Sequence, residues 1–314
     1  MASSGSVDYQ SSRTNFIETA LKLCGVLREG VSASANQLTD GAHALNIIMK
    51  SFHSHGMPLW AIRESAVFPI EDVNTVTLGP SGGHAATTYA ATYLTAAAAS
   101  GATALTVNSI TGISASDQLG VELNSGDIDW TTVSGAPSGS TVTAAVALTA
   151  AAAINNRVYA YTTKTVKPLK IIQAALYNYD TTTQVPVNII SRDEYERLSD
   201  ITVEGPPNQI YYIPGVLTGI LKFYPRFPDG SSVIKIWFQR PFEDMDAAGD
   251  TADFPQEWEN AITWELAAHL GMAYNVPVRK MNMIMQKAQF ELAKVNDFGM
   301  EEGSVYFTSN SSGR

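Results

Sequence analysis

The residues at 79–83, Gly-Pro-Ser-Gly-Gly, have the types needed for a serine nucleophile, with Ser81 at their centre and His84 directly after them. They match the G-x-S-x-G nucleophile elbow, in which a strand, a strained turn and a helix expose a reactive serine. Here Pro80 lies within the turn, and a stretch rich in alanine and threonine follows where the helix should begin. We therefore predict a flexible hinge at Ser81 rather than a hydrolase active site.

Two further groups have the residue types of metal ligands. His53 and His55 stand two positions apart at the end of a helical pattern, so their side chains point apart and cannot chelate one ion. Asp127 and Asp129 are closely spaced oxygen donors, but their spacing is not that of a calcium-binding loop. We predict surface histidines, a turn between two strands, and no metal, cofactor or catalytic residue.

Acidic residues gather at Glu243, Asp244 and Asp246, with Asp250 and Asp253 beyond them. A run of this kind is ordinarily a solvated loop. The alternative is an acidic rim of a ring or channel, since the chain carries a net charge of −10 and a negative lumen would let DNA slide without sticking. Glu243, Asp244 and Asp246 are therefore candidates for a lumen or inter-subunit contact.

Length and composition limit the classes of protein. The 314 residues suggest about two domains, on a prior of roughly 150 residues each. Charged residues make up 16% of the chain and form no basic patch, which disfavours tight binding of nucleic acid. There is no apolar run near the ~18 residues of a membrane span, and no secretory signal. With one cysteine, Cys24, no internal disulfide can form, so we predict synthesis in a reducing cytoplasm. Because no apolar run is long enough, we also predict no membrane contact.

Helical patterns lie near both ends of the chain and must help to position these groups. Apolar residues recur with helical spacing over 14–27, with Gly30 as a stop, and over 38–52, where Ser34 or Asn36 suits the N-cap. Helical spacing returns after Pro255 and continues over 278–298. We predict a helical bundle formed by the N- and C-terminal helices, residues 13–60 and 254–298.

The middle of the chain has strand patterns. They cover 62–78, 169–177, 185–191, 209–213, 219–224 and 233–238, with a short helix at 192–197. Residues 82–162 carry five charged side chains, and their alternating runs at 104–108, 118–123, 128–133, 141–143 and 157–161 predict a small all-β module. The expected fold class is α+β: the bundle, a central β domain (61–81 and 163–253), the all-β insertion (82–162) and a C-terminal docking tail (299–314).

Several segments, in their order along the chain, carry a resemblance. They are Ala-Leu-Asn-Ile-Ile-Met at 44–49, Val-Pro-Val-Asn-Ile-Ile-Ser-Arg-Asp-Glu-Tyr at 185–195, Gly-Pro-Pro-Asn-Gln-Ile-Tyr-Tyr at 205–212, Gly-Ile-Leu at 219–221, Phe-Tyr-Pro at 223–225, Ile-Lys-Ile-Trp-Phe-Gln-Arg-Pro-Phe at 234–242, Phe-Pro-Gln-Glu-Trp at 254–258 and Ala-Ile-Thr-Trp-Glu-Leu-Ala at 261–267. Over residues 14–78 and 163–298 the chain resembles the head-to-tail adaptor (head-completion, connector) proteins of short-tailed, podovirus-type double-stranded DNA phages. The module at 82–162 resembles β insertions of phage structural proteins and departs from the simplest adaptor pattern.

The resemblance implies a virion structural protein at the portal–tail junction that is not an enzyme. It implies a homo-oligomeric ring of twelve subunits that binds the portal protein and the tail nozzle or tail-tube protein, while packaged DNA passes through without sequence-specific binding. It also implies a C-terminal segment that reaches the portal, which makes Val305, Tyr306 and Phe307 the portal-docking candidates. Head-to-tail contacts close such a ring, and a strand-like tail can add to the edge of a partner's sheet.

Two alternatives stay open. One is another component of the same particle: a nozzle, tail-tube or baseplate protein. The other is a glycan-binding or hydrolytic tail module whose site lies in the insertion. It predicts that Trp130, Tyr159 and Tyr161 are exposed in one groove, and burial of all three would exclude it.

Overall fold

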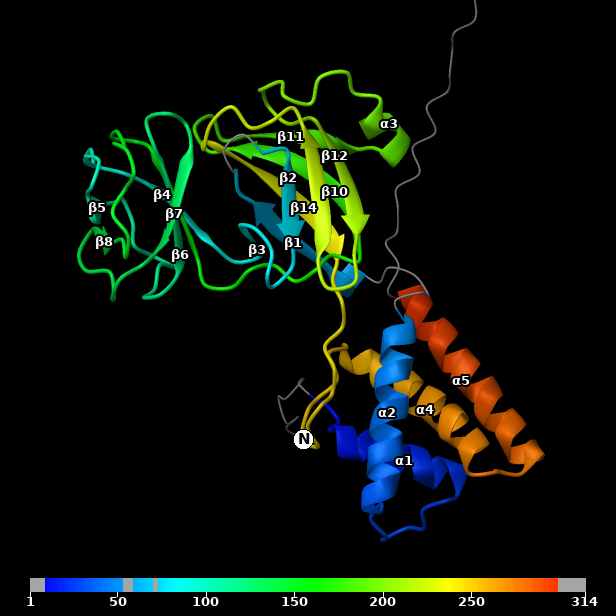
Figure 1. Cartoon of the computed structure of the whole chain (residues 1–314). Coiled ribbons are helices and arrows are strands. Elements are labelled where there is room, and N and C mark those ends of the chain that lie inside the picture. The colour runs from blue at the N-terminus through cyan, green and yellow to red at the C-terminus, as the bar shows by residue number, and fades with distance from the viewer. Residues whose placement is uncertain (1–8, 53–58, 70–72, 299–314) are drawn as a thin grey trace, which may run out of the picture. The chain divides into compact units, whose positions relative to one another are not determined.

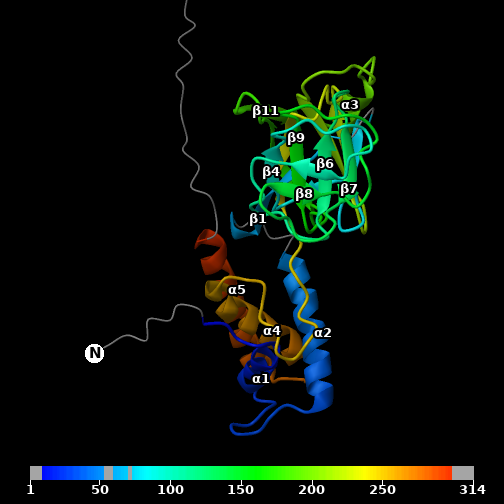
Figure 2. The same cartoon turned by 90° about the vertical axis from the view of Figure 1, so that its left-hand side faces the viewer.

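The computed structural model describes residues 9–52, 59–69 and 73–298 (Figures 1 and 2). Contacts divide these residues into two compact units. The β unit runs from Ile62 to Arg240, and the helical unit consists of the described residues up to Ala61 and from Pro241 onward. The β unit is therefore an insertion within the sequence of the helical unit.

The helical unit is built on four long helices. They are α1 (Arg13–Cys24), α2 (Ala35–Ser51), α4 (Glu259–Ala273) and α5 (Val278–Phe298). The short 3-10 turn η2 (Leu59–Ala61) precedes the first strand of the β unit, and η3 (Gln256–Trp258) leads into α4. The predicted cap of α2 is confirmed, because Ser34 and Gln37 form a reciprocal capping box. Helix α1 ends before the predicted stop at Gly30, since Gly25 already takes the left-handed conformation (φ 78°) that closes a helix.

Helix α4 is the centre of the helical core. It packs against α1, α2 and α5 and buries residues on most of its surface, including Ile262 and Leu266. The connection at 241–253 also belongs here, because Phe242 and Met245 are buried among the helices and Arg13 donates a backbone hydrogen bond to Asp250. The expected central β domain ended at 253, so this boundary differs from the prediction.

The β unit is dominated by one eight-stranded sheet. Its order is β2 (Thr75–Leu78), β13 (Gly219–Tyr224), β12 (Gln209–Pro214), β11 (Thr183–Ile189), β10 (Lys170–Asn178), β14 (Ser232–Gln239), β1 (Ile62–Val67) and β3 (Ala85–Ala86). All neighbours are antiparallel except β11 and β12, which are parallel and are joined through the short helix α3 (Arg192–Glu196). Both ends of the sheet contribute to one buried core, with Val76 and Phe223 beside Ile171 and Ile236, so the sheet curls over its apolar face.

The residues at 82–162 form most of a smaller β module at one end of this sheet (Figure 1). Four strands pair in the order β4 (Ala90–Tyr93), β9 (Arg157–Tyr161), β6 (Gln118–Glu122) and β7 (Ile128–Thr132), and β5 (Ala104–Thr106) pairs with β8 (Thr141–Thr143). These strands confirm the short alternating runs of the sequence. The module has its own small core, whose members are mostly valine, leucine and alanine.

An aromatic cluster joins the module to the large sheet. Phe68 of the chain after β1 packs against Tyr159 and Tyr161 of β9, and Val233 of β14 completes the contact. The Tyr159 hydroxyl donates a hydrogen bond of 2.8 Å to the carbonyl of Gly230. The module and the sheet therefore share buried apolar area and belong to one folded unit.

The expected fold class, an α+β protein built around a helical bundle, is wrong. Strands hold 30% of the residues and helices 27%, and the eight-stranded sheet is the largest single element. The helices were easy to find because their apolar spacing is local. The size of the sheet was hard to predict, because the sheet arises from pairings between strands far apart in the chain, such as β2 with β13.

Candidate docking surfaces

The turn around Ser81 lacks the structure of a nucleophile elbow. Strand β2 ends at Leu78, and the chain passes through the turn into the two-residue strand β3 without a helix. The turn is also fastened, because Gly82 and Gly83 donate backbone hydrogen bonds to Gly79 and Thr77. The segment is therefore a hydrogen-bonded turn, where a flexible hinge was expected.

His84 is a packing residue. Its ring stacks on Trp130 with centroids 3.7 Å apart, and its Nδ1 lies 2.7 Å from the Tyr161 hydroxyl. Burial, with a smaller contribution from the positive charge of Lys164, lowers the pKa of His84 from 6.5 to about 4. The ring is therefore neutral near pH 7 and holds the module against the sheet.

The aromatic groove that a glycan-binding module would need is not formed by the three predicted residues. Tyr159 and Tyr161 are fully buried, and Trp130 is half-buried under His84. All three contribute to the joint between the module and the sheet. Two of the three rings are therefore unavailable for stacking on a sugar, while Trp130 keeps part of its surface exposed. The condition set for excluding this alternative, burial of all three, is met for Tyr159 and Tyr161 only.

The candidate metal ligands have structural partners or lie elsewhere. Asp127 accepts a hydrogen bond of 2.6 Å from Ser125, and Asp129 accepts two from Thr149, so both stabilise turns. His53 and His55 lie outside the described residues. Within the described part of the chain, no three His, Cys, Asp or Glu side chains gather as a metal site would require.

The acidic loop is fastened to the helices. Asp244 forms an ion pair with Lys50 of α2 at 2.9 Å, and the Glu243 amide donates to a carboxylate oxygen of Asp253. Arg13 of α1 donates to the carbonyls of Met245 and Asp246. Glu243, Asp244 and Asp246 are nevertheless exposed, so their carboxylates form an acidic edge on the helical unit.

The other predicted contact, Val305, Tyr306 and Phe307, lies outside the described residues. The prediction that this segment docks on a portal has no geometry to examine. It stays a prediction.

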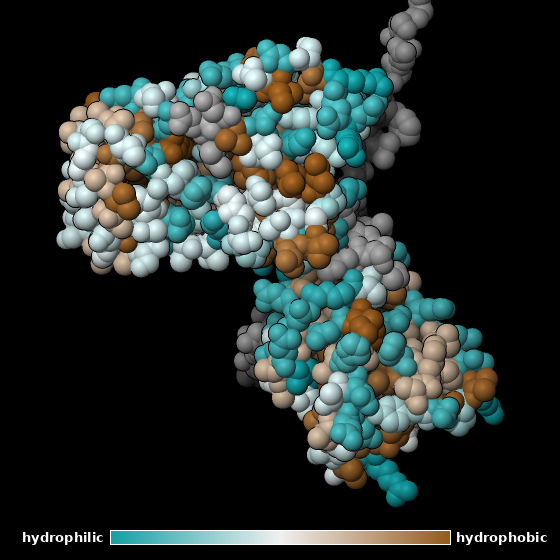
Figure 3. Space-filling view, viewed as in Figure 1, coloured by the Kyte–Doolittle hydropathy of each residue, from teal (hydrophilic) through white to brown (hydrophobic). Residues whose placement is uncertain are grey.

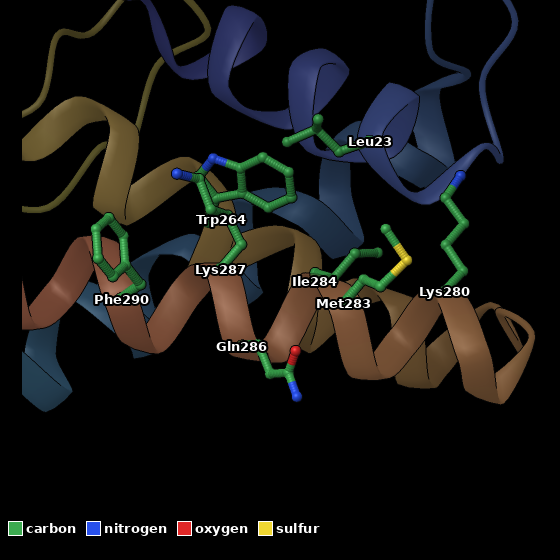
Figure 4. A pocket seen from close by; sticks show the side chains of 8 residues that line it. All are labelled: Leu23, Trp264, Lys280, Met283, Ile284, Gln286, Lys287 and Phe290. Carbon is green, nitrogen blue, oxygen red and sulfur yellow. The ribbon is translucent and has the colours of Figure 1, made fainter.

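Sequence reasoning missed an apolar groove on the helical unit. We call it the α5 groove; it has a volume of about 530 Å³ and is seen from close by in Figure 4. Leu23 of α1 and Trp264 of α4 face Met283, Ile284 and Phe290 of α5. Met283 and Phe290 are 64% and 62% exposed, although apolar residues of a helix usually turn toward the core. The signal was present in the sequence, because Met283 and Phe290 stand seven residues apart on one side of α5, away from its core stripe.

The second missed feature is the tip of the β12–β13 hairpin. Val216 and Leu217 are 90% and 82% exposed, the highest values among the large apolar side chains. Lys167 fixes the tip by donating hydrogen bonds to the carbonyls of Gly215 and Val216. A turn of four residues normally carries polar side chains, so two apolar residues between Gly215 and Gly219 were the available signal.

Apolar residues are also visible elsewhere on the surface: on the face seen in Figure 3 they lie among hydrophilic ones on both units. No helix in the described residues is long and apolar enough to cross a membrane.

No protein-family model matches this chain, and no curated protein sequence matches it either.

Proposed function

We propose that this protein is a head-to-tail adaptor of a short-tailed double-stranded DNA phage. As a virion structural protein, it would form a ring, of twelve subunits by resemblance, between the portal and the tail nozzle or tail tube. The ring would continue the DNA channel, and its work would be mechanical, with no catalytic step. The sequence segments that resemble adaptor proteins provide the reason to consider this role.

The structural observation that carries the proposal is the exposed pair Val216 and Leu217. Leaving two large apolar side chains in water forgoes roughly 1.5–3 kcal/mol each, relative to burying them. A protruding apolar tip that fits a different surface on a neighbour gives a head-to-tail contact, and such contacts close rings when the rotation allows. Lys167 also holds the backbone of the tip through two hydrogen bonds, which reduces the entropy that would be lost on docking.

The charge distribution supports the same role. The exposed carboxylates of Glu243, Asp244 and Asp246 form an acidic edge, and the net charge of the chain is −10. A repeated acidic edge around a ring would repel the DNA backbone and keep it from adhering to the channel. A free-standing DNA-binding protein would need the opposite sign.

The test is native mass spectrometry of the full-length protein, alone and mixed with the portal protein encoded in the same phage genome. We expect a closed ring bound to the portal. The double variant Val216→Asp/Leu217→Asp should lose the ring, because two charges would have to be buried at the contact. The matched control Val146→Asp/Ile154→Asp changes two other exposed apolar residues, 65% and 56% exposed, and should assemble normally.

A wild-type protein that stays monomeric with the portal would overturn the adaptor role. Rings formed equally well by Val216→Asp/Leu217→Asp would remove the observation on which the proposal rests. Open tubes that grow without the portal would favour the tail-tube alternative instead.

A further inference from the structure

The α5 groove needs a cover, because it exposes apolar side chains on a helix surface that otherwise packs well. We infer that in the free protein the groove receives this chain's own segment at 305–307, Val-Tyr-Phe. The segment would act as a latch that must leave the groove before it can dock on any partner. This inference concerns the protein alone and does not depend on the adaptor role.

The segment at 305–307 is close enough along the chain to reach the groove. Helix α5 lines the groove and ends at Phe298, so the segment is attached at the end of the surface it would cover. Phe290 lies eight residues before Phe298, which is roughly 12 Å along a helix at 1.5 Å per residue. The six residues at 299–304 span about 20 Å when extended, so Val305 can return to the level of Phe290 and beyond.

An extended segment that runs back along α5 would place its apolar residues at the groove. If the chain reverses at Gly299 and then runs extended at roughly 3.3 Å per residue, Glu302 comes level with Leu292, less than one helical turn from Lys294. Residues 305–307 then lie level with positions 286 to 281, a stretch of α5 that contributes Ile284 and Met283 to the groove. The order of side chains in the segment, acidic first and apolar second, therefore follows the order of side chains along α5.

The side chains that line the α5 groove suit an aromatic segment. Trp264, Ile284 and Leu23 offer an apolar floor, and Phe290 stands at the rim with Lys287 placed 5.0 Å from its ring centroid. A Tyr–Phe pair can bury its rings against these residues, and aromatic pairs add roughly 0.5–1.5 kcal/mol beyond area burial.

Charge orients the segment rather than holding it. Lys294 is exposed one helical turn beyond Phe290, in a second hollow that borders α5 near the level of Glu302. Glu257 and Glu291 line the same hollow, and Glu291 is already paired with Lys287 at 2.5 Å. Since these carboxylates offset part of the lysine charge, the apolar side chains must supply most of the binding. Weak apolar binding is enough to keep the segment in the groove, because the attachment to α5 is a short tether that gives the segment an effective concentration of about millimolar.

Disulfide trapping tests the latch. Ser304→Cys leaves Val305, Tyr306 and Phe307 unchanged, and it is combined with Lys287→Cys in the groove or with Gln289→Cys as the matched control. Gln289 is exposed and lies about 200° around the helix from Lys287, so it is equally tethered but faces away from the groove. Cys24 is buried at 4% exposure and is retained. The dilute monomer is oxidised mildly, and the linked peptides are identified by mass spectrometry.

We expect the Ser304–Lys287 cysteine pair to close about tenfold faster than the Ser304–Gln289 pair. Adding Tyr306→Ser and Phe307→Ser should remove this difference. Equal rates for the two pairs would overturn the inference, as would a rate unchanged by the two serine substitutions, because the tether alone would then explain the link. Covalent dimers in place of linked monomers would also overturn it and would assign the groove to a second copy of the chain.

Discussion

Arg157 and Asp180 connect the inserted module to the large sheet. The guanidinium of Arg157, in β9, donates two hydrogen bonds of 2.9 and 2.6 Å to one carboxylate oxygen of Asp180, in the turn between β10 and β11. The same guanidinium lies 5.8 and 5.7 Å from the ring centroids of Tyr93 and Tyr179. Arg157 thus combines an ion pair, two cation–π contacts and a largely buried stem at one junction.

Replacing Arg157 by Ala should destabilise the β unit by about 2 kcal/mol, because packing and cation–π contacts are lost with the charge. Replacing Asp180 by Asn should cost less than about 1 kcal/mol, since its carboxylate is more than half exposed and screened by water. Urea unfolding gives the free energies, and hydrogen exchange of the β6 and β9 amides reports the junction. Arg197→Ala is the control, because its ion pair with Asp193 is exposed on both sides and should contribute almost nothing. Equal losses for Arg157→Ala and Arg197→Ala would contradict this account of the junction.

His84 should make the β unit less stable in mild acid. Its pKa is about 4 when folded and 6.5 when free, so the unfolded chain binds a proton at a pH where the folded chain does not. Stability should therefore fall as the pH drops from about 6.5 to about 4 and level off below. We expect a loss of about 1–2 kcal/mol after allowing for the partial exposure of the ring.

The matched variant for this pH dependence is His84→Phe, which keeps a ring against Trp130 and removes the titration. The difference in unfolding free energy between wild type and variant, measured from pH 7 to pH 4, isolates the histidine from Glu122, whose pKa is raised mainly by burial. An identical pH slope in both proteins would refute the assignment.

Gly41 is a packing residue of α2. A Cβ at this position would come within 2.5 Å of the Cγ2 atom of Ile17 in α1. Alanine favours a helix over glycine by about 1 kcal/mol, but overpacking a core costs typically 1–3 kcal/mol. We expect Gly41→Ala to destabilise the helical unit by about 1 kcal/mol, as measured by urea unfolding.

Gly249→Ala is the control for Gly41→Ala, because nothing lies near the added Cβ and its effect should be close to zero. In a double-mutant cycle, Gly41→Ala should cost less when Ile17 is already alanine, since the clashing methyl group is gone. Independent, additive effects would show that the two side chains do not compete for space.

The capping box of α2 gives a further prediction. The Ser34 hydroxyl accepts a hydrogen bond from the Gln37 amide, so Ser34→Ala should cost about 1 kcal/mol. Ser32 is a neighbouring exposed serine outside the box, and Ser32→Ala should leave the unfolding free energy within about 0.5 kcal/mol of wild type. A loss shared by both variants would point to the loop rather than to the cap.

The sequence predicted those elements whose signal is local. The strands at 118–122, 157–161 and 219–224 appear within one residue of the alternating runs, and the Ser34 cap appears where a serine precedes a helical pattern. Strand β4 was missed because its residues, Ala-Ala-Thr-Tyr, offer little contrast between apolar and polar faces. The large sheet was underestimated because strand order is decided by contacts between distant segments, and no period within one strand encodes its neighbour.

The docking surfaces were harder to predict for a different reason. Periodicity identifies apolar residues, and the ordinary inference is that they are buried. Met283 and Phe290 lie on the side of α5 opposite Met281 and Leu292, but single apolar residues on an exposed face are common and do not by themselves indicate a groove. Conversely, Tyr159 and Trp130 had the types of a ligand site and instead hold two sheets together.

The β unit is attached through two peptide links, at Ala61–Ile62 and Arg240–Pro241, and these links begin and end a pair of adjacent strands. Strands β1 and β14 are antiparallel, with Ile62 opposite Gln239. Tension between the two units would therefore be divided between two covalent links and would pull both strands lengthwise in the same direction. The hydrogen bonds from β14 to β10, which pair over eight residues, would be loaded in shear and would share the load, whereas β1 pairs with β3 over two residues. The connection of the chain therefore divides any such load between two adjacent strands that are paired with each other over six residues.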